Sequence, residues 1–282
     1  MPVPRLLIIN ADDLGLAPGV NRGIAEAHAA GTVTSASIMV RAPAFEEAAA
    51  LVRDTMPTLG VGLHFDLLSC RSRNQASSLT DPATGNFRSL GELTVRALAG
   101  QVTTADVRAE CDAQLRCLAE AGITPTHVDS HRHTHALPGV LAGVVASARD
   151  AGIRVVRRPL DQISVLDPVA SAKMLALHAS WRVALSGLDA AGITLLGHAP
   201  HFRGIALQGT LDVKDRILAL LDRLPRGATE LMLHPGYDDA ALAAQDPYRV
   251  ERERELAALT SPEVRERLAR GDVQLATFAQ LS

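Results

Sequence analysis

Short apolar runs alternate along the chain with longer segments whose apolar residues recur at helical spacing. The short runs predict strands at residues 6–9, 34–40, 59–64, 125–129, 153–156, 194–197 and 229–233, with a last one at 273–276. The longer segments predict helices at residues 18–30, 44–53, 137–151, 212–224 and 250–268, and a further helix that passes through Trp181.

This repeated strand–helix alternation, with runs that are apolar on both faces, predicts an α/β fold built on a parallel sheet. Seven or eight units predict a closed or nearly closed (β/α) barrel of seven to eight parallel strands, and a doubly wound open sheet is the alternative. A chain of 282 residues, of which 47% are hydrophobic, is long enough to form such a barrel as one domain, residues 1–282.

One stretch, residues 69–90, interrupts the alternation. It is polar and rich in serine, asparagine, glycine and proline. Loops of this length are usually active-site lids or binding loops, or else they are disordered. We therefore expect a lid or binding loop at residues 69–90.

Composition narrows the range of partners. The net charge is −3 and no basic stripe is present, so a nucleic acid is not expected as a partner. The chain has neither a signal peptide nor an apolar stretch of about 20 residues, which predicts a soluble, cytoplasmic protein without a membrane partner. Three cysteines do not form a disulfide framework. The apolar helical residues 174–188 offer a face through which a homodimer could form.

Polar and ionisable residues follow most of the predicted strands, and they include seven of the ten histidines. These residues are Asp12 and Asp13; His64 and Asp66; Asp129, His131, His133 and His135; Arg157 and Arg158; His198 and His201; and His234, Asp238 and Asp239. The carboxyl ends of parallel strands meet at one face, where barrels and sheets build their sites. The pattern therefore predicts an active site at the C-terminal ends of the strands.

The first candidate is the pair Asp12 and Asp13, on a turn that leaves a buried strand. Adjacent carboxylates in extended chain point in different directions. One can bind a metal ion while the other faces a water molecule as a base. The alternative is a cap for the following helix, but that helix is expected to begin only near Pro18.

The densest feature is the run HVDSHRHTH, residues 127–135. In an extended stretch its alternate residues would share one face, which would place His127 beside the others. Metal sites take three or four protein ligands, so not all of these side chains can bind one ion. We select His131 as a ligand and Asp129 as a residue that orients it. His133 and His135 are either structural or face the substrate.

His64 and His234 each end an apolar strand. His64 is a candidate ligand, with a structural core histidine as the alternative. His234 precedes Pro-Gly on a rigid turn and suits a general acid, with a loop-capping histidine as the alternative. One aspartate and two histidines leave coordination positions open for water or substrate. This ligand set suits Zn, Co, Ni or Mn better than Mg.

Four segments of the chain also occur, in the same order, in a known family. The segments are NADDLGLAPGVNRGIAEAHAAGTVTSAS, GLHFDL, THVDSHRHTH and ELMLHPGYDD, and the tail YRVERERELAALTSPEVRERL fits as well. The chain resembles the YdjC-like carbohydrate deacetylases, which include the chitooligosaccharide deacetylases. The resemblance covers nearly the whole chain.

The resemblance implies a distorted (β/α) barrel and hydrolysis of the acetamide of an N-acetylated sugar. It also implies that Asp13, His64 and His131 bind the metal, that Asp12 is the base and that His234 is the acid. It suggests Mg, so the expected cofactor is one divalent ion, Mg or Zn, with Co, Ni and Mn open. Residues 69–90 do not match the chitooligosaccharide members, so the particular sugar stays open.

Further residues are candidates to orient the catalytic groups or to contact substrate. They are Asp129, Arg158, His133, His201 and Tyr237, of which Arg158 could orient Asp12. Sugar sites often stack rings on aromatic side chains, which make up only 3% of this chain. Phe65, Phe202 and Tyr237 are expected near the active face.

Two other functions fit parts of this pattern. A metal-dependent phosphoesterase on a similar barrel would use the same residue types, with Arg157 and Arg158 as a phosphate clamp, although it would usually need two metal ions. A non-catalytic protein that binds a metal or an acetylated ligand is the second alternative. The spare carboxylate of Asp12 argues against it, because binding alone needs no base.

Overall fold

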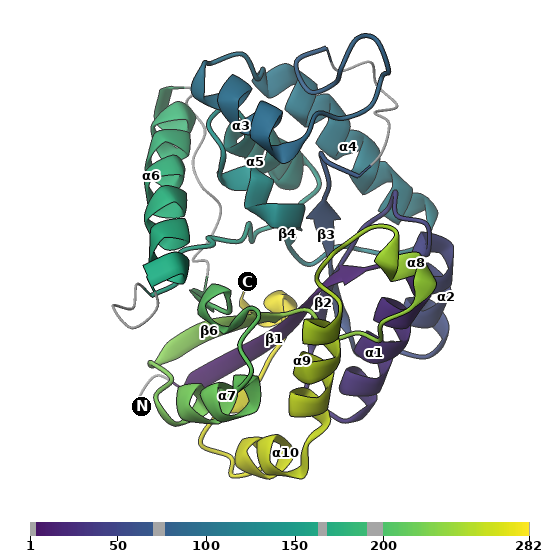
Figure 1. Ribbon diagram of the computed structural model, residues 1–282, viewed down its shortest axis with the longest axis vertical. Coiled ribbons are helices and arrows are strands. Elements are labelled where there is room, and N and C mark those ends of the chain that lie inside the picture. The colour runs from purple at the N-terminus through teal and green to yellow at the C-terminus, as the bar shows by residue number, and fades with distance from the viewer. Residues whose placement is uncertain (1–3, 70–76, 163–167, 191–199, 282) are drawn as a thin grey trace.

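The computed structural model (Figure 1) describes residues 4–69, 77–162, 168–190 and 200–281, with the backbone alone described at 168–170 and 189–190. Its centre is a parallel sheet in the order β4-β3-β2-β1-β6-β5, with β7 paired to β1. The strands are β1 (Arg5–Leu14), β2 (Ser35–Ile38), β3 (Gly60–Phe65), β4 (Val128–Ser130), β5 (His201–Arg203), β6 (Gly227–Leu233) and β7 (Gln274–Leu275).

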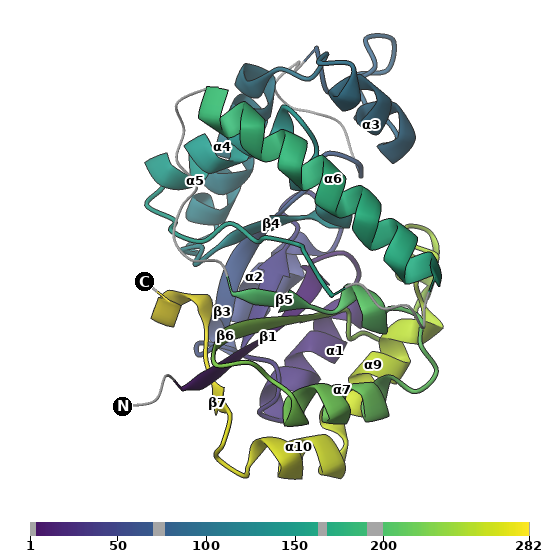
Figure 2. The same cartoon turned by 90° about the vertical axis from the view of Figure 1, so that its left-hand side faces the viewer.

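Helices surround this sheet (Figures 1 and 2). They are α1 (Pro18–Ala29), α2 (Phe45–Asp54), α3 (Leu90–Leu98), α4 (Thr104–Glu120), α5 (Val140–Asp150), α6 (Pro168–Ala190), α7 (Val213–Asp222), α8 (Ala240–Ala243), α9 (Val250–Thr260) and α10 (Pro262–Leu268). Helix α1 packs between α2 and α9, and α5 packs between α4 and α6. Short 3₁₀ turns cover His131–Ala136, Ile205–Leu207 and Phe278–Leu281.

The strand order is that of a barrel, since consecutive strands are neighbours and β6 returns to pair with β1. A parallel bridge between Val128 and Val156 extends the sheet beyond β4. Within the described ranges, no pairing joins the segment at Val156 to β5. The predicted α/β barrel is thus confirmed, as a parallel sheet curled into a half-barrel.

Two of the predicted strands differ from the structure. The run at residues 153–156 is buried at Ile153, Val155 and Val156, but it pairs only through one bridge at Val156. A short apolar run does not distinguish a strand from a buried extended segment. The strand predicted at residues 194–197 lies outside the described residues, and β5 follows at His201–Arg203.

The helix predicted at residues 250–268 is broken into α9 and α10. The break falls at Ser261, which has extended backbone and whose Oγ accepts a hydrogen bond from the N–H of Val264. Pro262 then occupies the first turn of α10, where its missing N–H costs nothing. The sequence did not reveal this boundary, because similar runs of charged residues lie on both sides of it.

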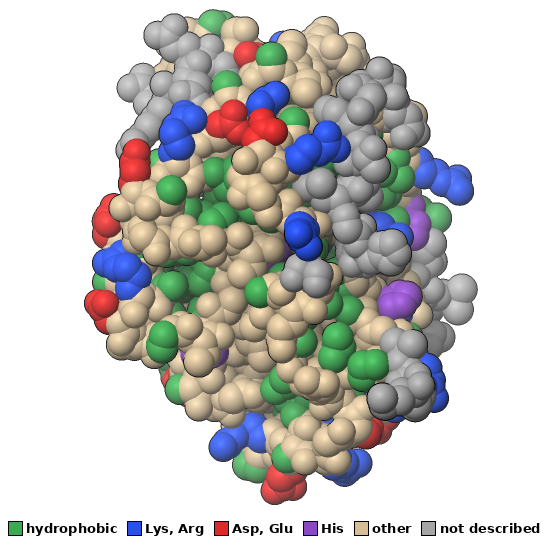
Figure 3. All heavy atoms as spheres, turned by 180° about the vertical axis from the view of Figure 1, so that it is seen from behind, with side chains coloured by type: hydrophobic (Ala, Val, Ile, Leu, Met, Phe, Trp, Pro, Cys, Tyr) green, Lys and Arg blue, Asp and Glu red, His purple; other side chains and the backbone are tan. Residues whose placement is uncertain are grey.

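The distribution of surface charge and the state of the cysteines agree with what the composition predicted. On the face seen in Figure 3, the coloured acidic and basic side chains are interspersed. Cys111 is buried and Cys117 half-buried, and neither forms a disulfide. None of the described helices is both long enough and apolar enough to span a membrane.

Candidate metal and catalytic site

Asp12 and Asp13 lie at an irregularity near the end of β1. The register between β1 and β2 shifts between Ala11 and Leu14, and Asp13 has a positive φ of 69°. Such a bulge re-aims side chains, and a positive φ is uncommon for any residue other than glycine. The two carboxylates, both buried, consequently face different partners, as the sequence predicted for an adjacent pair.

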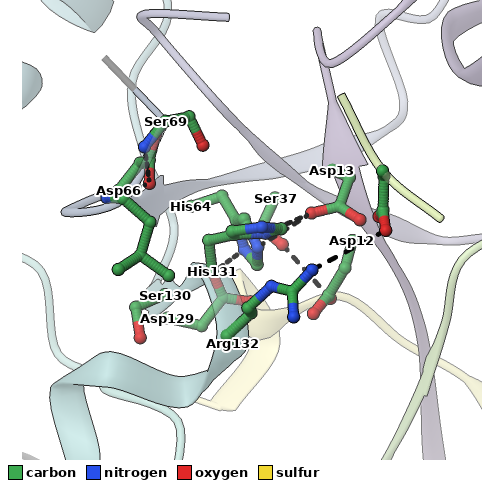
Figure 4. Close-up of polar contacts among 12 residues, drawn as sticks. Asp12, Asp13, Ser37, His64, Asp66, Ser69, Asp129, Ser130, His131 and Arg132 are labelled. Atoms are coloured by element: carbon green, nitrogen blue, oxygen red, sulfur yellow. Dashed lines mark hydrogen bonds and ion pairs between the residues drawn. The ribbon is translucent and has the colours of Figure 1, made fainter. Parts of the chain in front are cut away.

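Asp13 faces two histidines from neighbouring strand ends (Figure 4). Its Oδ1 lies 3.2 Å from Nε2 of His64 at the end of β3, and 2.9 Å from Nδ1 of His131 after β4. One ligand atom from each of the three residues lies within 4.8 Å of the others, the geometry that one cation requires. The structure thus brings together the three residues predicted as ligands.

The other nitrogen of His64 is held by Asp129. Its Nδ1 lies 2.7 Å from Oδ1 of Asp129, which accepts the hydrogen bond from this nitrogen and leaves Nε2 facing Asp13. Burial lowers the pKa of His64, but the charges of Asp129 and Asp12 and the hydrogen bonds to Asp129 and Asp13 outweigh burial and raise it well above its usual range. These acidic residues therefore create a strong preference for a positive charge at this position.

Asp12 is bound by a different cation, Arg157, which is fully buried. Nη1 and Nη2 of Arg157 donate to the two oxygens of Asp12, each at 2.7 Å. Asn10 and Ser37 also donate to Oδ1 of Asp12 at 2.8 and 3.3 Å. Burial raises the pKa of Asp12, but the charge and hydrogen bonds of Arg157 outweigh it and hold that pKa well below its usual range. Asp12 is therefore an ionised, fixed carboxylate.

Arg157 serves two more carboxylates. Its Nη2 lies 2.7 Å from Oδ2 of Asp129 and 2.6 Å from Oε1 of Glu230 on β6, which also accepts from Nε at 2.7 Å. Burial raises the pKa of Glu230 to about 7, against the lowering effect of Arg157 and with a further rise from Asp129 and Asp12. Of the three acids around one guanidinium, Glu230 is the one that takes up a proton near neutral pH.

A second buried arginine, Arg252 on α9, contacts the other side of Asp13. Its Nη2 donates to Oδ2 of Asp13 at 2.7 Å and to Oδ2 of Asp246 at 2.6 Å. Its Nε donates to the carbonyl of Tyr248 at 2.8 Å. Arg252 therefore fixes Asp13 to the segment that precedes α9.

His234 lies just after β6, where it contacts Glu255 on α9 and Tyr248, which precedes that helix. Its backbone N–H donates to Oε2 of Glu255, and its Nδ1 lies 3.8 Å from that oxygen. The ring packs edge-on against Tyr248 with centroids 5.5 Å apart. The hydroxyl of Tyr248 donates in turn to Oε1 of Glu255. His234 is thus held through its backbone and its ring face.

The histidine-rich run does not present one shared face. Beyond β4 the chain enters a 3₁₀ turn in which Arg132 and His133 have positive φ values of 52° and 55°. His127 instead stacks on Phe278 with ring centroids 3.8 Å apart. His135 is structural, with its nitrogens 2.5 Å from Oγ of Ser130 and 3.0 Å from the carbonyl of Arg157. The predicted common face is wrong beyond His131, because the chain leaves the extended conformation of β4 at Arg132 and His133.

Several predicted supporting residues lie elsewhere. Arg158 is exposed, and Asp12 is bound by Arg157, one position earlier. His201 is an exposed residue at the start of β5, in register with Thr229, four residues before β6 ends. The hydroxyl of Tyr237 donates to Glu26 on α1. Asp66 accepts from the backbone N–H groups of Leu68 and Ser69 (Figure 4).

A cavity of about 390 Å³ opens over these groups. Its walls contain both aspartates, His64, His131 and His234, together with polar residues that include His133, Lys173 and Gln208. Nζ of Lys173 donates to Oε1 of Gln208 at 2.9 Å. Two further cavities of about 450 and 430 Å³ adjoin it, and Leu90 and Arg132 line all three. A ligand larger than one acetyl group therefore has room.

Four residues of the site were not identified from the sequence in these roles: Arg157, Glu230, Arg252 and Glu255. Arg157 follows a predicted strand beside Arg158, and spacing alone does not separate the two. Glu230 could have been identified from the sequence, because it is a single acidic residue in the otherwise apolar predicted strand TELML. Arg252 and Glu255 are spaced to share one face of a helix, but they lie in a run of charges that resembles a solvated surface.

The chain matches known proteins over nearly its whole length. The model of the family described as YdjC-like protein matches residues 6–270. A carbohydrate deacetylase of Geobacillus stearothermophilus is 38% identical over 99% of this chain and 98% of its own. One from Homo sapiens is 35% identical over 100% of this chain and 93% of its own. A chitooligosaccharide deacetylase of Enterobacter sp. is 32% identical over 98% and 99%.

The fold has a solved counterpart. A crystal structure from Enterococcus faecalis V583, whose name refers to cellobiose-phosphate cleavage, superposes with a TM-score of 0.77 at 27% identity and covers 99% of both chains. Sequence and structure agree over essentially the full length. The chain belongs to the YdjC-like protein family.

Proposed function

We propose that this protein is a divalent-metal-dependent hydrolase that removes the acetyl group from an N-acetylated sugar. The observation that carries the proposal is the difference between the two adjacent carboxylates: Asp13 contacts two histidines, whereas both oxygens of Asp12 are bound by Arg157. Relatives that match nearly the whole chain are named carbohydrate deacetylases, which supports the same function.

The residues around Asp13 fit a metal ion. Asp13, His64 and His131 offer one oxygen and two nitrogens, and the tautomer of His64 is set by Asp129. Three protein ligands leave positions open for other molecules. Two imidazoles favour Zn, Co, Ni or Mn over Mg. When bound, such a cation polarises an amide carbonyl and makes a water molecule more acidic.

Asp12 then acts as the base. It accepts a proton from the water whose oxygen attacks the acetyl carbon. Arg157, Asn10 and Ser37 fix the orientation of the carboxylate, so that little reorganisation precedes the transfer. The low pKa of Asp12 keeps it ionised across the neutral range.

His234 acts as the acid. Its protonated imidazole gives a proton to the amide nitrogen as the carbon–nitrogen bond breaks, so that a neutral amine leaves. Glu255 holds the backbone N–H of His234, and the ring of Tyr248 packs edge-on against the imidazole. The products are acetate and a free amino sugar.

The cavity suits a polar ligand of sugar size. The lining residues Lys173, Gln208 and His133 are hydrogen-bonding groups, and Tyr248 supplies an aromatic surface. Phe65 and Phe202, expected near the active face, are buried and do not line the cavity. Phe202 does lie beside the site, edge-on to His133 and under the guanidinium of Arg157. Asp129 was predicted to orient His131 but instead contacts His64. His133 is proposed to contact substrate.

The phosphoesterase alternative is less favoured by the charges. A second group that could hold a cation consists of Asp12, His64 and Asp129. Arg157 already bridges Asp12 and Asp129, so its guanidinium takes the place that a second metal ion would need. Moreover, Arg158, proposed for a phosphate clamp, is exposed.

The test is acetate and phosphate release measured side by side, from N-acetylated sugars and from sugar phosphates, with the wild-type chain and Asp12→Asn. The proposal expects acetate release, lowered about 10²- to 10⁴-fold by the substitution, with metal binding retained. Phosphate release without acetate release would favour the phosphoesterase. Full activity of Asp12→Asn would remove Asp12 from the role of base.

A further inference from the structure

Two fully buried arginines flank the acidic pair, and they differ in one respect. Every nitrogen of Arg157 has a carboxylate partner, from Asp12, Asp129 or Glu230. No nitrogen of Arg157 is therefore left without a partner.

Arg252 is not saturated in this way. Its Nε donates to the carbonyl of Tyr248, and its Nη2 donates to Asp13 and Asp246. Its Nη1 is buried and has no hydrogen-bond partner among the described residues. A guanidinium has five N–H donors, and the two on Nη1 remain. Leaving a buried charged donor unpaired is costly, so such a group calls for a ligand, a water molecule or an ion.

The position of Arg252 indicates which ligand this is. It lines the same cavity as Asp12, Asp13 and His234. It binds Oδ2 of Asp13, while Oδ1 of the same carboxylate faces His64 and His131. Arg252 also lies over the ring of Tyr248, 5.7 Å from its centroid, and Tyr248 packs on His234. Arg252 therefore belongs to the wall of the cavity in which the acetyl group must lie if Asp12 and His234 act on it.

We propose that Arg252 is a catalytic residue that donates from Nη1 to the acetyl oxygen as negative charge develops on it, and afterwards to the carboxylate of acetate. This inference rests on the proposed deacetylation. When water adds to the carbonyl carbon, the π electron pair moves onto the oxygen, and it returns when the carbon–nitrogen bond breaks. Arg252 keeps its protons throughout, and the only proton transfers are those of Asp12 and His234.

The geometry favours arginine for this task. Three donor sites of one rigid guanidinium already hold Asp13, Asp246 and Tyr248, so Nη1 is fixed without help from substrate. A preorganised donor aimed at developing charge is among the largest single contributions to catalysis. A lysine has one flexible ammonium and cannot both hold Asp13 and donate from a second fixed point.

The test compares Arg252→Lys with wild type in three measurements: kcat and KM for an N-acetylated sugar, the Kd of the metal alone, and the Kd of acetate for the metal-loaded protein. We expect kcat to fall about 10²- to 10³-fold with KM nearly unchanged, as for loss of one oxyanion donor. Acetate affinity is expected to fall about tenfold, while metal affinity stays within about threefold. Excess metal is expected to restore nothing.

A parallel loss of metal affinity and kcat, reversed by excess metal, would overturn the proposal, because Arg252 would then only support Asp13. The matched control is Arg267→Lys, a buried arginine on α10 that pairs with Asp222 and Asp272 away from the cavity. It is expected to leave all three values unchanged. Circular dichroism checks that each variant is folded.

If Arg252→Lys does not fold, a crystal structure of the metal-loaded wild type with acetate decides. We expect an acetate oxygen at hydrogen-bond distance from Nη1 of Arg252, and acetate bound away from Nη1 would overturn the proposal. Acetate binding needs no turnover. A wild type that binds acetate at Nη1 but deacetylates no sugar would therefore contradict the proposed function alone.

Discussion

Arg252 and Glu255 lie three residues apart on one face of α9, and each binds a different half of the site. Arg252 donates to the carboxylate of Asp13, and Glu255 accepts the backbone N–H of His234. A helix near the C-terminus thus fixes both a candidate metal ligand at the end of β1 and the candidate acid after β6. The strand ends carry the reactive groups, and the contacts of α9 link Asp13 to His234.

The first prediction concerns Glu255. Glu255→Gln weakens the hydrogen bonds to His234 and Tyr248, so the imidazole loses its support while the ligands around Asp13 are untouched. We expect kcat to fall at least about tenfold with metal affinity unchanged. Steady-state kinetics and metal titration check this.

The matched control is Glu253→Gln, an exposed residue on the same helix. It accepts only the N–H of Asp238 in the described structure, and its substitution should leave kcat unchanged. An equal loss in both variants would show that α9 acts through its overall charge.

The second prediction compares neighbouring arginines. Arg157→Lys leaves Asp12, Asp129 and Glu230 with one ammonium in place of a guanidinium that touches all three. Breaking a buried ion network of this kind costs about 3 kcal/mol of unfolding free energy. Arg158→Lys changes an exposed side chain and is expected to stay within about 0.5 kcal/mol.

Urea denaturation of both variants at neutral pH measures these differences. Similar unfolding free energies for the two variants would contradict the assignment of Arg157 as the cation that holds the acids together.

The third prediction concerns pH. Burial, the largest cause, lowers the pKa of His127 and of His135 to about 4. Well above pH 6.5 both rings are neutral in the folded and unfolded states, so they add no pH dependence there. Between pH 6.5 and about 4 only the unfolded chain takes up protons at these positions. Unfolding free energy therefore falls with decreasing pH in that window, by about 1.4 kcal/mol per pH unit for each ring.

Denaturation curves between pH 4 and 8 test this, with His127→Gln as the comparison. The variant lacks one titrating ring and should show a slope smaller by about one proton between pH 4 and 6.5. An unchanged slope would mean that His127 is charged in the folded protein.

The fourth prediction concerns packing beneath the site. A Cβ added to Gly62 on β3 would lie 2.3 Å from Cε1 of His127, whose ring is pinned against Phe278. Gly62→Ala is expected to lower unfolding free energy by about 1–3 kcal/mol. Gly187→Ala on α6 meets nothing within 4 Å, and it should be neutral or stabilising by up to about 1 kcal/mol.

Thermal melts of the two alanine variants provide the comparison. In the double variant Gly62→Ala/His127→Ala the added methyl group no longer meets the ring. Its loss of stability should therefore be smaller than the sum of the losses of the two single variants. Additive losses would show that the alanine and the ring do not meet.

The sequence predicted the parts of this site that depend on topology. His64, His131 and His234 follow buried runs, and parallel strands bring such positions to one face regardless of loop detail. The divergence of Asp12 and Asp13 followed from the geometry of adjacent residues. Both inferences needed only strand order.

The residues that orient these groups depend on details that periodicity does not carry. Arg157 and Arg158 are the same residue type at adjacent positions, so the sequence does not distinguish them. Only the path of the chain after Val156 makes the first buried and the second exposed. The positive φ values of Arg132 and His133 break the extended pattern that would have aligned His131 with His133 and His135. Arg252 has its role because α9 packs on α1, a contact between distant parts of the sequence.

The most direct test of the central claim is acetate release from a panel of N-acetylated sugars by chelated protein, before and after addition of Zn, Co, Ni, Mn or Mg, with Asp13→Asn as the control. The account predicts no acetate from the chelated protein, restored release from at least one sugar with at least one metal, and little restoration in Asp13→Asn. Acetate release that is indifferent to chelation, or that survives fully in Asp13→Asn, would contradict it.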